Sequence, residues 1–134
     1  MIYVDTSALL KRYVDESDSD QAEALLRADP TWVTARITLV ETRRNLARLL
    51  VEPVARAHAL RTFAVDWARM HVVEIDAVTC ETAAALGEST GARSLDALHL
   101  AAATRVLGPG GAFLTFDVRL AQVARALGLE VRGG

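Results

Sequence analysis

Four acidic residues occupy positions from which a shared cation site could be built: Asp5, Glu41, Asp96 and Asp117. The runs 2–4 and 112–115 have the β-branched and aromatic composition of short strands, and an aspartate follows each run directly or shortly after it. Glu41 and Asp96 fall near the starts of two predicted helices. In a parallel α/β sheet, strand ends and the helix starts that follow them share one edge, where ligands bind. We therefore expect the four carboxylates to converge on that edge.

Each carboxylate also has an ordinary structural explanation. The two aspartates that follow strands could cap the next helix, and the charge of Asp96 suits the first turn of a helix. Glu41 could be a solvated helical residue that pairs with Arg44 or Asn45. These explanations stay open for any one residue, but the joint placement of all four favours a common site.

The chemistry of the four side chains indicates a hard cation. Two carboxylates roughly 4 Å apart repel by ~4 kcal/mol at an effective dielectric constant near 20, and a divalent ion removes that penalty. Ligation by oxygen alone suits Mg²⁺ or Mn²⁺. His58 and His71 lack zinc spacing, and Cys80 is the only cysteine, which excludes an internal disulfide and a thiolate zinc site. We interpret His99, one turn after Asp96, as a buried histidine with satisfied hydrogen bonds rather than as a catalytic group.

Composition and length indicate a single domain over residues 1–134. Hydrophobic residues make up 51% of the chain, enough for a packed core, and aromatic residues only 5%, which argues against a base-stacking platform. The net charge of −2 gives no general attraction to nucleic acid. No apolar run approaches the ~18 residues of a membrane span, and Asp5 would interrupt the apolar part of a signal peptide. We expect a soluble cytoplasmic protein.

Helices that alternate with short strands predict a three-layer α/β/α domain with a central, mostly parallel sheet. Apolar periodicity, caps and breakers predict strands at 2–5, 32–34, 72–75, 112–116 and 129–131. The same signals predict helices at 8–14, 21–28, 37–51, 53–70, 77–88, 95–107 and 118–127. Thr6 and Ser7 are expected to cap the first helix, and Ser94 the helix that starts at residue 95.

The helices 37–51 and 53–70 are predicted to form a protruding hairpin. Its apolar residues exceed what a thin hairpin can bury and indicate a surface for a partner or a second copy of the chain: Leu46, Leu49, Leu50, Val54, Leu60, Phe63 and Trp67. Several arginines flank Glu41 and could clamp an RNA backbone, contact a partner or form a solvated face: Arg36, Arg43, Arg44 and Arg48.

Three segments resemble PIN-domain ribonucleases, in the order that this family shows. Residues 2–9 (IYVDTSAL) resemble the family's first strand and turn, residues 94–101 (SLDALHLA) its central acidic helix, and residues 114–120 (LTFDVRL) its late strand and turn. Glu41 falls on the helix where the family keeps a glutamate. In length and in the lack of further domains the chain is similar to VapC, the toxin of VapBC toxin–antitoxin pairs.

The resemblance implies a Mg²⁺- or Mn²⁺-dependent endoribonuclease. Asp5 and Asp96 match metal ligands, Asp117 matches a residue that binds the metal directly or through water, and Glu41 matches one that holds waters around the ion. Hydroxyls that orient the carboxylates or a phosphate are implied at Thr6, Ser7 and Thr115. Attack by an activated water would leave a 5′-phosphate and a 3′-hydroxyl.

The resemblance also implies partners: an RNA substrate, a VapB-like antitoxin whose C-terminal segment lies along the hairpin, and a second copy in a homodimer. The alternative is a non-catalytic PIN-fold module that binds RNA or protein. A haloacid-dehalogenase phosphatase would need an aspartate where Ser7 stands. A phospho-acceptor receiver domain would need an adjacent acidic pair before the first helix and a late lysine at a strand end, and neither is present.

Overall fold

A parallel sheet of five short strands forms the centre of the fold in a computed structural model that describes residues 1–134. The strands are β1 (Ile2–Val4), β2 (Trp32–Ala35), β3 (His71–Val73), β4 (Ala112–Leu114) and β5 (Glu130–Arg132). Their order in the sheet is β3-β2-β1-β4-β5, and every neighbouring pair is parallel. All carboxyl ends of the strands therefore lie on one edge, with β1 in the middle.

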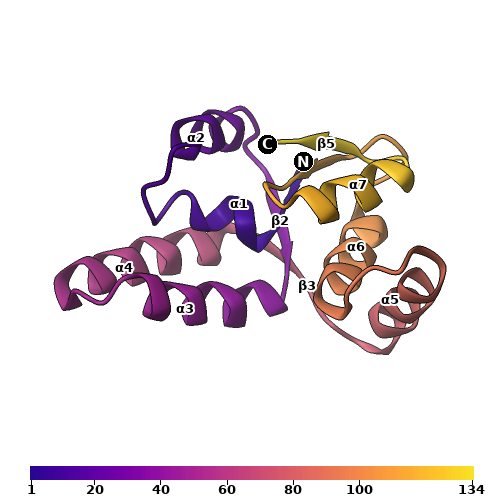
Figure 1. The fold of residues 1–134 in the computed structure, drawn as a ribbon, viewed down its shortest axis with the longest axis horizontal. Helices are drawn as coiled ribbons and strands as arrows, with labels where there is room; N and C mark the ends of the chain where they lie inside the picture. Colours follow the sequence, from indigo (N-terminus) through magenta and orange to yellow (C-terminus); the bar gives the residue numbers. More distant parts are fainter.

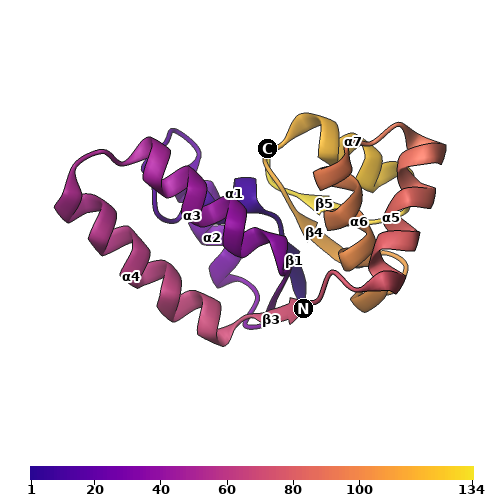
Figure 2. The same cartoon turned by 90° about the horizontal axis from the view of Figure 1, so that it is seen from below.

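Seven helices cover the sheet: α1 (Thr6–Leu10), α2 (Ser19–Arg27), α3 (Ile37–Leu49), α4 (Pro53–Arg69), α5 (Ala77–Thr90), α6 (Ser94–Val106) and α7 (Val118–Ala126). Helices α1 to α4 lie on one side of the sheet and α5 to α7 on the other (Figures 1 and 2). Helices α3 and α4 run side by side and extend away from the sheet as a hairpin in both views. The predicted three-layer architecture with its protruding hairpin is confirmed.

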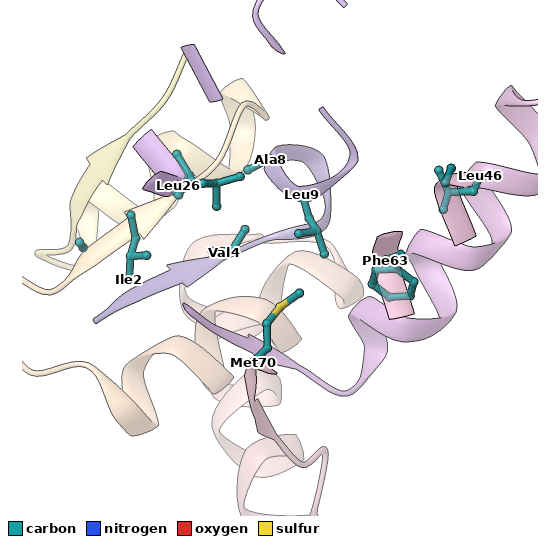
Figure 3. Close-up of a cluster of buried hydrophobic side chains, with 11 residues drawn as sticks. Ile2, Val4, Ala8, Leu9, Leu26, Leu46, Phe63 and Met70 are labelled. Carbon is teal, nitrogen blue, oxygen red and sulfur yellow. The ribbon is translucent and has the colours of Figure 1, made fainter. Parts of the chain in front are cut away.

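The sheet is buried on both faces because its side chains alternate between two cores. Ile2 and Val4 of β1 point to the core under α1 to α4, together with Leu9 and Leu46 (Figure 3). Tyr3 points to the opposite core. Both faces of a parallel sheet are covered by helices, which explains why the strands read as continuous apolar runs.

The hairpin buries more of its apolar surface than we predicted. Leu46 and Phe63 are buried in the first core, and three further predicted surface residues pack against it: Leu50, Leu60 and Trp67. Leu49 and Val54 do remain exposed, at 41% and 72% of their surface. As members of a partner surface, Leu46 and Phe63 were predicted wrongly, because the sheet, α1 and α2 supply the apolar surface that the two helices lack by themselves.

A buried ionic cluster fastens the hairpin to the rest of the molecule. Asp66 of α4 is 6% exposed and accepts hydrogen bonds from Arg12 Nε at 2.7 Å and from the Tyr13 hydroxyl at 2.6 Å. Arg12 also donates to Glu23 of α2 at 2.6 Å. The carboxylates compensate the guanidinium charge, so the cluster ties α2 and the segment after α1 to α4.

Two predicted helix caps were wrong. Asp5, not Thr6 or Ser7, caps α1, because its carboxylate accepts the Ala8 N–H. Arg93 stands at the N-cap of α6 without a side-chain hydrogen bond, and Ser94 is already helical.

The first helix is also shorter than predicted. It ends at Leu10 instead of residue 14, because the N–H groups of residues 11 to 13 bond three residues back in tight turns. The other boundaries differ from the predicted ones by two residues or fewer.

The end of the chain supports the sheet edge that carries the acidic residues. Gly133 has φ +109°, and a Cβ at this position would lie 2.2 Å from the carbonyl oxygen of Thr115. The Thr115 N–H donates to the Arg132 carbonyl at 3.0 Å. Only glycine allows this approach, so β5 and its exit hold the segment after β4 in place. Among the helices of the chain, none combines the length and apolar character that crossing a membrane requires.

Candidate active site

Asp5 is the most buried carboxylate at the carboxyl edge of the sheet. It follows β1 and is 3% exposed. Its carboxylate accepts hydrogen bonds from the Ser7 hydroxyl at 2.7 Å, the Ala8 N–H at 3.1 Å and the Thr115 hydroxyl at 3.0 Å. Burial raises the pKa of Asp5, while His99 and these hydrogen bonds oppose that rise.

Two hydroxyls join Asp5 to the turn after β4. Ser7 Oγ accepts the Phe116 N–H at 3.0 Å and lies 3.3 Å from Thr115 Oγ1. Thr115 Oγ1 accepts the N–H of Asp117 at 3.0 Å. Two of the three predicted hydroxyl residues, Ser7 and Thr115, thus contact Asp5, and the turn that carries Asp117 is bonded to the same pair.

Asp117 caps α7, as we predicted for an aspartate that follows a strand. Its Oδ1 accepts the N–H groups of Arg119 and Leu120 at 2.9 and 3.0 Å. Only Oδ1 accepts the capping bonds. Capping α7 therefore does not prevent this exposed residue from taking part in a site at the sheet edge.

Glu41 reaches the same edge from α3. Its Oε1 accepts the Thr6 hydroxyl at 2.8 Å and lies 2.7 Å from His99 Nε2. Burial raises the pKa of Glu41, but the hydrogen bonds from His99 and Thr6 and the electrostatic effect of His99 together outweigh it, and the pKa is lowered. The suggested pairing of its carboxylate with Arg44 or Asn45 was wrong, because Asn45 donates to the Glu41 carbonyl oxygen and not to the side chain.

Asp96 lies half-buried in the first turn of α6 and accepts no hydrogen bond from the chain. Burial raises the pKa of Asp96, and the negative charge of Asp117 raises it further. Glu41 acts in the same direction, whereas His99 and Arg93 oppose it. The electrostatic coupling shows that these carboxylates share one region of the molecule and repel each other there.

The four predicted acidic residues thus lie near one edge of the sheet, but their side chains do not form a complete set of metal ligands. No group of three or more His, Cys, Asp or Glu side chains stands close enough together to hold an ion as the side chains are oriented. The available ligand atoms nevertheless fit a hard cation, because they are carboxylate oxygens. Asp5 is buried, and Asp96 lies close to other negative charges. Mg²⁺ commonly uses one or two protein carboxylates and keeps several waters.

Sequence reasoning missed the contact of His99 with Glu41 and the part that Tyr3 plays beside it. We predicted correctly that His99 is buried with satisfied hydrogen bonds, since it is 2% exposed and both ring nitrogens have partners. The available signal was its position one turn after Asp96, which puts the two residues on the same side of α6. Among the arginines, Arg36 pairs with Glu74, and the remaining three are exposed: Arg43, Arg44 and Arg48.

A hollow of the surface lies away from these acidic residues, near the start of β2. It is lined by Arg12, Asp66, Trp32 and neighbouring residues. Its charged groups are paired with each other, and Trp32 Nε1 donates to the Leu26 and Asp29 carbonyls. No polar group there is left over for a ligand except Arg69, so the acidic edge is the better candidate site.

The parallel sheet and its strand order define an α/β domain with acidic residues at one edge, and the chain belongs to the PIN domain family, which it matches over residues 2–126. Ribonuclease VapC35 of Mycobacterium tuberculosis is 38% identical to it over 135 aligned residues, which cover 98% of this chain and 95% of that protein. The predicted resemblance to PIN-domain ribonucleases of the VapC type is confirmed.

Solved structures share the fold. The crystal structure of Mycobacterium tuberculosis VapC20, a sarcin–ricin loop cleaving toxin, matches with a TM-score of 0.75 and 22% identity, over 99% of this chain and 100% of that one. A toxin–antitoxin complex from Klebsiella pneumoniae matches with a TM-score of 0.73 and 18% identity, over 97% and 96%. At these identities the two structures show the fold alone.

Proposed function

We propose that this chain is a Mg²⁺- or Mn²⁺-dependent endoribonuclease and the toxin of a type II toxin–antitoxin pair, with residues 1–134 acting as one domain. The observation that carries the proposal is the geometry of the acidic edge: Asp5 is buried and bonded to Ser7 and Thr115, and the Thr115 hydroxyl also accepts the Asp117 N–H. The 38% identity of the chain to a named ribonuclease also supports ribonuclease activity. Cleavage of cellular RNA would place the protein in the cytoplasm.

We assign the ion to Asp5, Asp96 and Asp117. When bound, a divalent cation lowers the pKa of water and offsets negative charge on a phosphodiester. Asp5 is already held by Ser7 and Thr115, so its orientation is set before any ion arrives. Asp96 has no competing hydrogen bond from the chain, and its pKa is raised by the charge that an ion would neutralise.

Glu41 is assigned to the attacking water. Both hydrogen bonds to its side chain fall on Oε1, from Thr6 and on the side of His99. Its Oε2 accepts no hydrogen bond from the chain and is free to orient a water or accept its proton. Hydrolysis by water leaves a 5′-phosphate and a 3′-hydroxyl.

The test is RNA cleavage by purified variants. Asp5→Asn and Asp96→Asn should each lower the rate by about a hundredfold or more with Mg²⁺ or Mn²⁺ present. Asp20→Asn, an exposed aspartate of α2, is the matched control and should cleave like the wild type. Circular dichroism checks that all variants are folded.

Full cleavage by either site variant would reject the assignment. Metal-replete wild-type protein that binds RNA without cutting it would favour the alternative of a non-catalytic module.

The partner is proposed to be a VapB-like antitoxin segment that docks on the hairpin. Exposed apolar side chains remain on α3, on α4 and at their connection: Val40, Leu49, Val51, Val54 and Val65. Val51 and Val54 are 80% and 72% exposed, more than a helix hairpin in water favours. The structural match to a toxin–antitoxin complex supports this choice, and a homodimer through another face is compatible with it.

A further inference from the structure

Tyr3, His99 and Glu41 form a chain of hydrogen bonds that joins three elements at the sheet edge. The Tyr3 hydroxyl lies 2.8 Å from His99 Nδ1, and His99 Nε2 lies 2.7 Å from Glu41 Oε1. The three residues come from β1, α6 and α3. Tyr3 is fully buried and His99 is 2% exposed, so water cannot replace either bond. The hydrogen bonds therefore run from Tyr3, in the core on one face of the sheet, to Glu41 of α3.

The donors and acceptors along this chain can be assigned. An ionised carboxylate only accepts hydrogen bonds, so His99 Nε2 carries a proton and donates it to Glu41. The Tyr3 hydroxyl lies 2.8 Å from His99 Nδ1, and Thr34 and the Ala35 N–H act as donors toward its oxygen. Burial raises the pKa of Tyr3 well above its usual value, so the hydroxyl keeps its proton and donates it to Nδ1. A neutral His99 with its proton on Nε2 satisfies all three groups.

The bonds at Glu41 are asymmetric. The Thr6 hydroxyl donates to the same Oε1 at 2.8 Å, so two donors from different elements hold one oxygen. Two bonds on Oε1 restrict rotation of the carboxylate and leave Oε2 unoccupied by the chain. A carboxylate held in one orientation loses less freedom when it acts on a substrate or a water.

Packing alone does not require the Tyr3 hydroxyl. The Tyr3 ring stacks on Phe113, with centroids 5.2 Å apart and planes within 6°, and a phenylalanine ring would keep that contact. The hydroxyl of Tyr3 is the group that contacts His99 Nδ1.

We propose that His99, with its tautomer set by Tyr3, is a positioning residue that holds Glu41 in its working orientation. The proposal rests on the function proposed above, in which Glu41 acts on water. The general case is known for metal-bound histidines, whose second ring nitrogen is fixed by a partner that sets tautomer and orientation. Here the histidine serves a carboxylate instead of a metal.

The first test is Tyr3→Phe, assayed for RNA cleavage at saturating metal. Because only the orientation of Glu41 is disturbed, kcat should fall about tenfold while KM for RNA stays within about twofold of wild type. Tyr13→Phe is the matched control, since it also removes a tyrosine hydroxyl that is hydrogen-bonded to another side chain, in this case Asp66. It should leave kcat unchanged. An unchanged kcat in Tyr3→Phe would overturn the proposal.

A second pair of variants tests the donor at position 99. His99→Gln keeps an N–H donor near Glu41, whereas His99→Leu removes it. We expect His99→Gln to retain more activity than His99→Leu by about tenfold. Equal activity in the two variants would mean that His99 has only a packing role. If Glu41→Gln abolishes cleavage while both tests at positions 3 and 99 have no effect, the proposed function stands and this inference fails.

Nitrogen-15 NMR of the histidine rings gives a readout that does not depend on cleavage. Wild-type protein should show His99 as a single neutral tautomer with its proton on Nε2, identified by its loss in His99→Gln. In Tyr3→Phe the two tautomers should mix. The exposed His58 and His71 serve as internal controls and should not change. A cationic His99 near pH 7, or an Nδ1–H tautomer, would overturn the assignment even if the wild type proved inactive.

Discussion

The Thr115 hydroxyl donates to Asp5 Oδ2 at 3.0 Å and accepts the Asp117 N–H at 3.0 Å. One fully buried side chain thus links the residue after β1 to the turn after β4, across 110 positions of sequence. The link holds the buried carboxylate and the exposed one in a fixed relation before any ligand is bound.

Thr115→Val should destabilise the protein by about 1–3 kcal/mol, because it leaves a buried carboxylate oxygen and a backbone N–H without partners. Denaturant unfolding measures the change. Thr104→Val is the control: Thr104 is exposed on α6 and bonds only the Ala101 carbonyl, so its effect should stay within about 0.5 kcal/mol. Equal effects of the two substitutions would contradict the role given to Thr115.

Asp96→Asn should make the metal-free protein more stable at neutral pH. The pKa of Asp96 is raised in the folded state by burial and by Asp117. The folded state therefore binds the proton more readily than the unfolded one, and stability falls as pH rises into the range where both forms are ionised. Removing the charge should recover on the order of 0.5 kcal/mol, about 2 °C in Tm, for this half-exposed group.

The same variant should respond less to metal. Wild-type protein at a hundredfold excess of ion over Kd is expected to gain about 2.7 kcal/mol, and Asp96→Asn should lose most of that gain. Thermal melts with and without Mn²⁺ give both quantities, with Asp20→Asn as the control for a lost surface charge. A metal-free Asp96→Asn protein that melts below the wild type would show that the repulsion is absent.

Glu41 should contribute stability that disappears in acid. Burial raises its folded pKa, but His99 and the Thr6 hydroxyl together lower it further than burial raises it. The contribution is complete above the unfolded pKa of about 4.3 and is lost as pH falls below that value through the folded pKa. The difference in unfolding free energy between wild type and Glu41→Gln should therefore shrink below about pH 4. Glu88→Gln, at an exposed position of α5, should show no such trend.

Val54→Ser should weaken assembly with the antitoxin without affecting the isolated chain. Val54 is 72% exposed, so its replacement should change stability by less than about 0.5 kcal/mol. Loss of a buried valine from an interface should lower affinity by about tenfold. Val78→Ser, at a 59% exposed position on α5, is the matched control. Titration calorimetry measures the affinity for the antitoxin. Equal loss of affinity in both variants would contradict a docking surface on the hairpin.

Local patterns were sufficient to predict the architecture and the acidic positions. Strand runs, helix periods and breakers are features of neighbouring residues, so Ile2–Val4, α3 and the capping role of Asp117 followed from the sequence. The family motifs extended this to the four carboxylates. Where local signals competed, prediction failed: Asp5 and Thr6 are both good caps, and only the hydrogen bond to the Ala8 N–H separates them.

The sequence by itself determined which chemical groups this protein carries and on which elements they lie, because periodicity and capping are encoded within a few residues. The tertiary structure alone decided which groups meet. His99 contacts Glu41 from 58 positions away, and Leu46 and Phe63 are buried since the sheet, α1 and α2 cover the hairpin. Such contacts depend on the packing of faces brought together by the strand order β3-β2-β1-β4-β5, which no local pattern in the chain specifies.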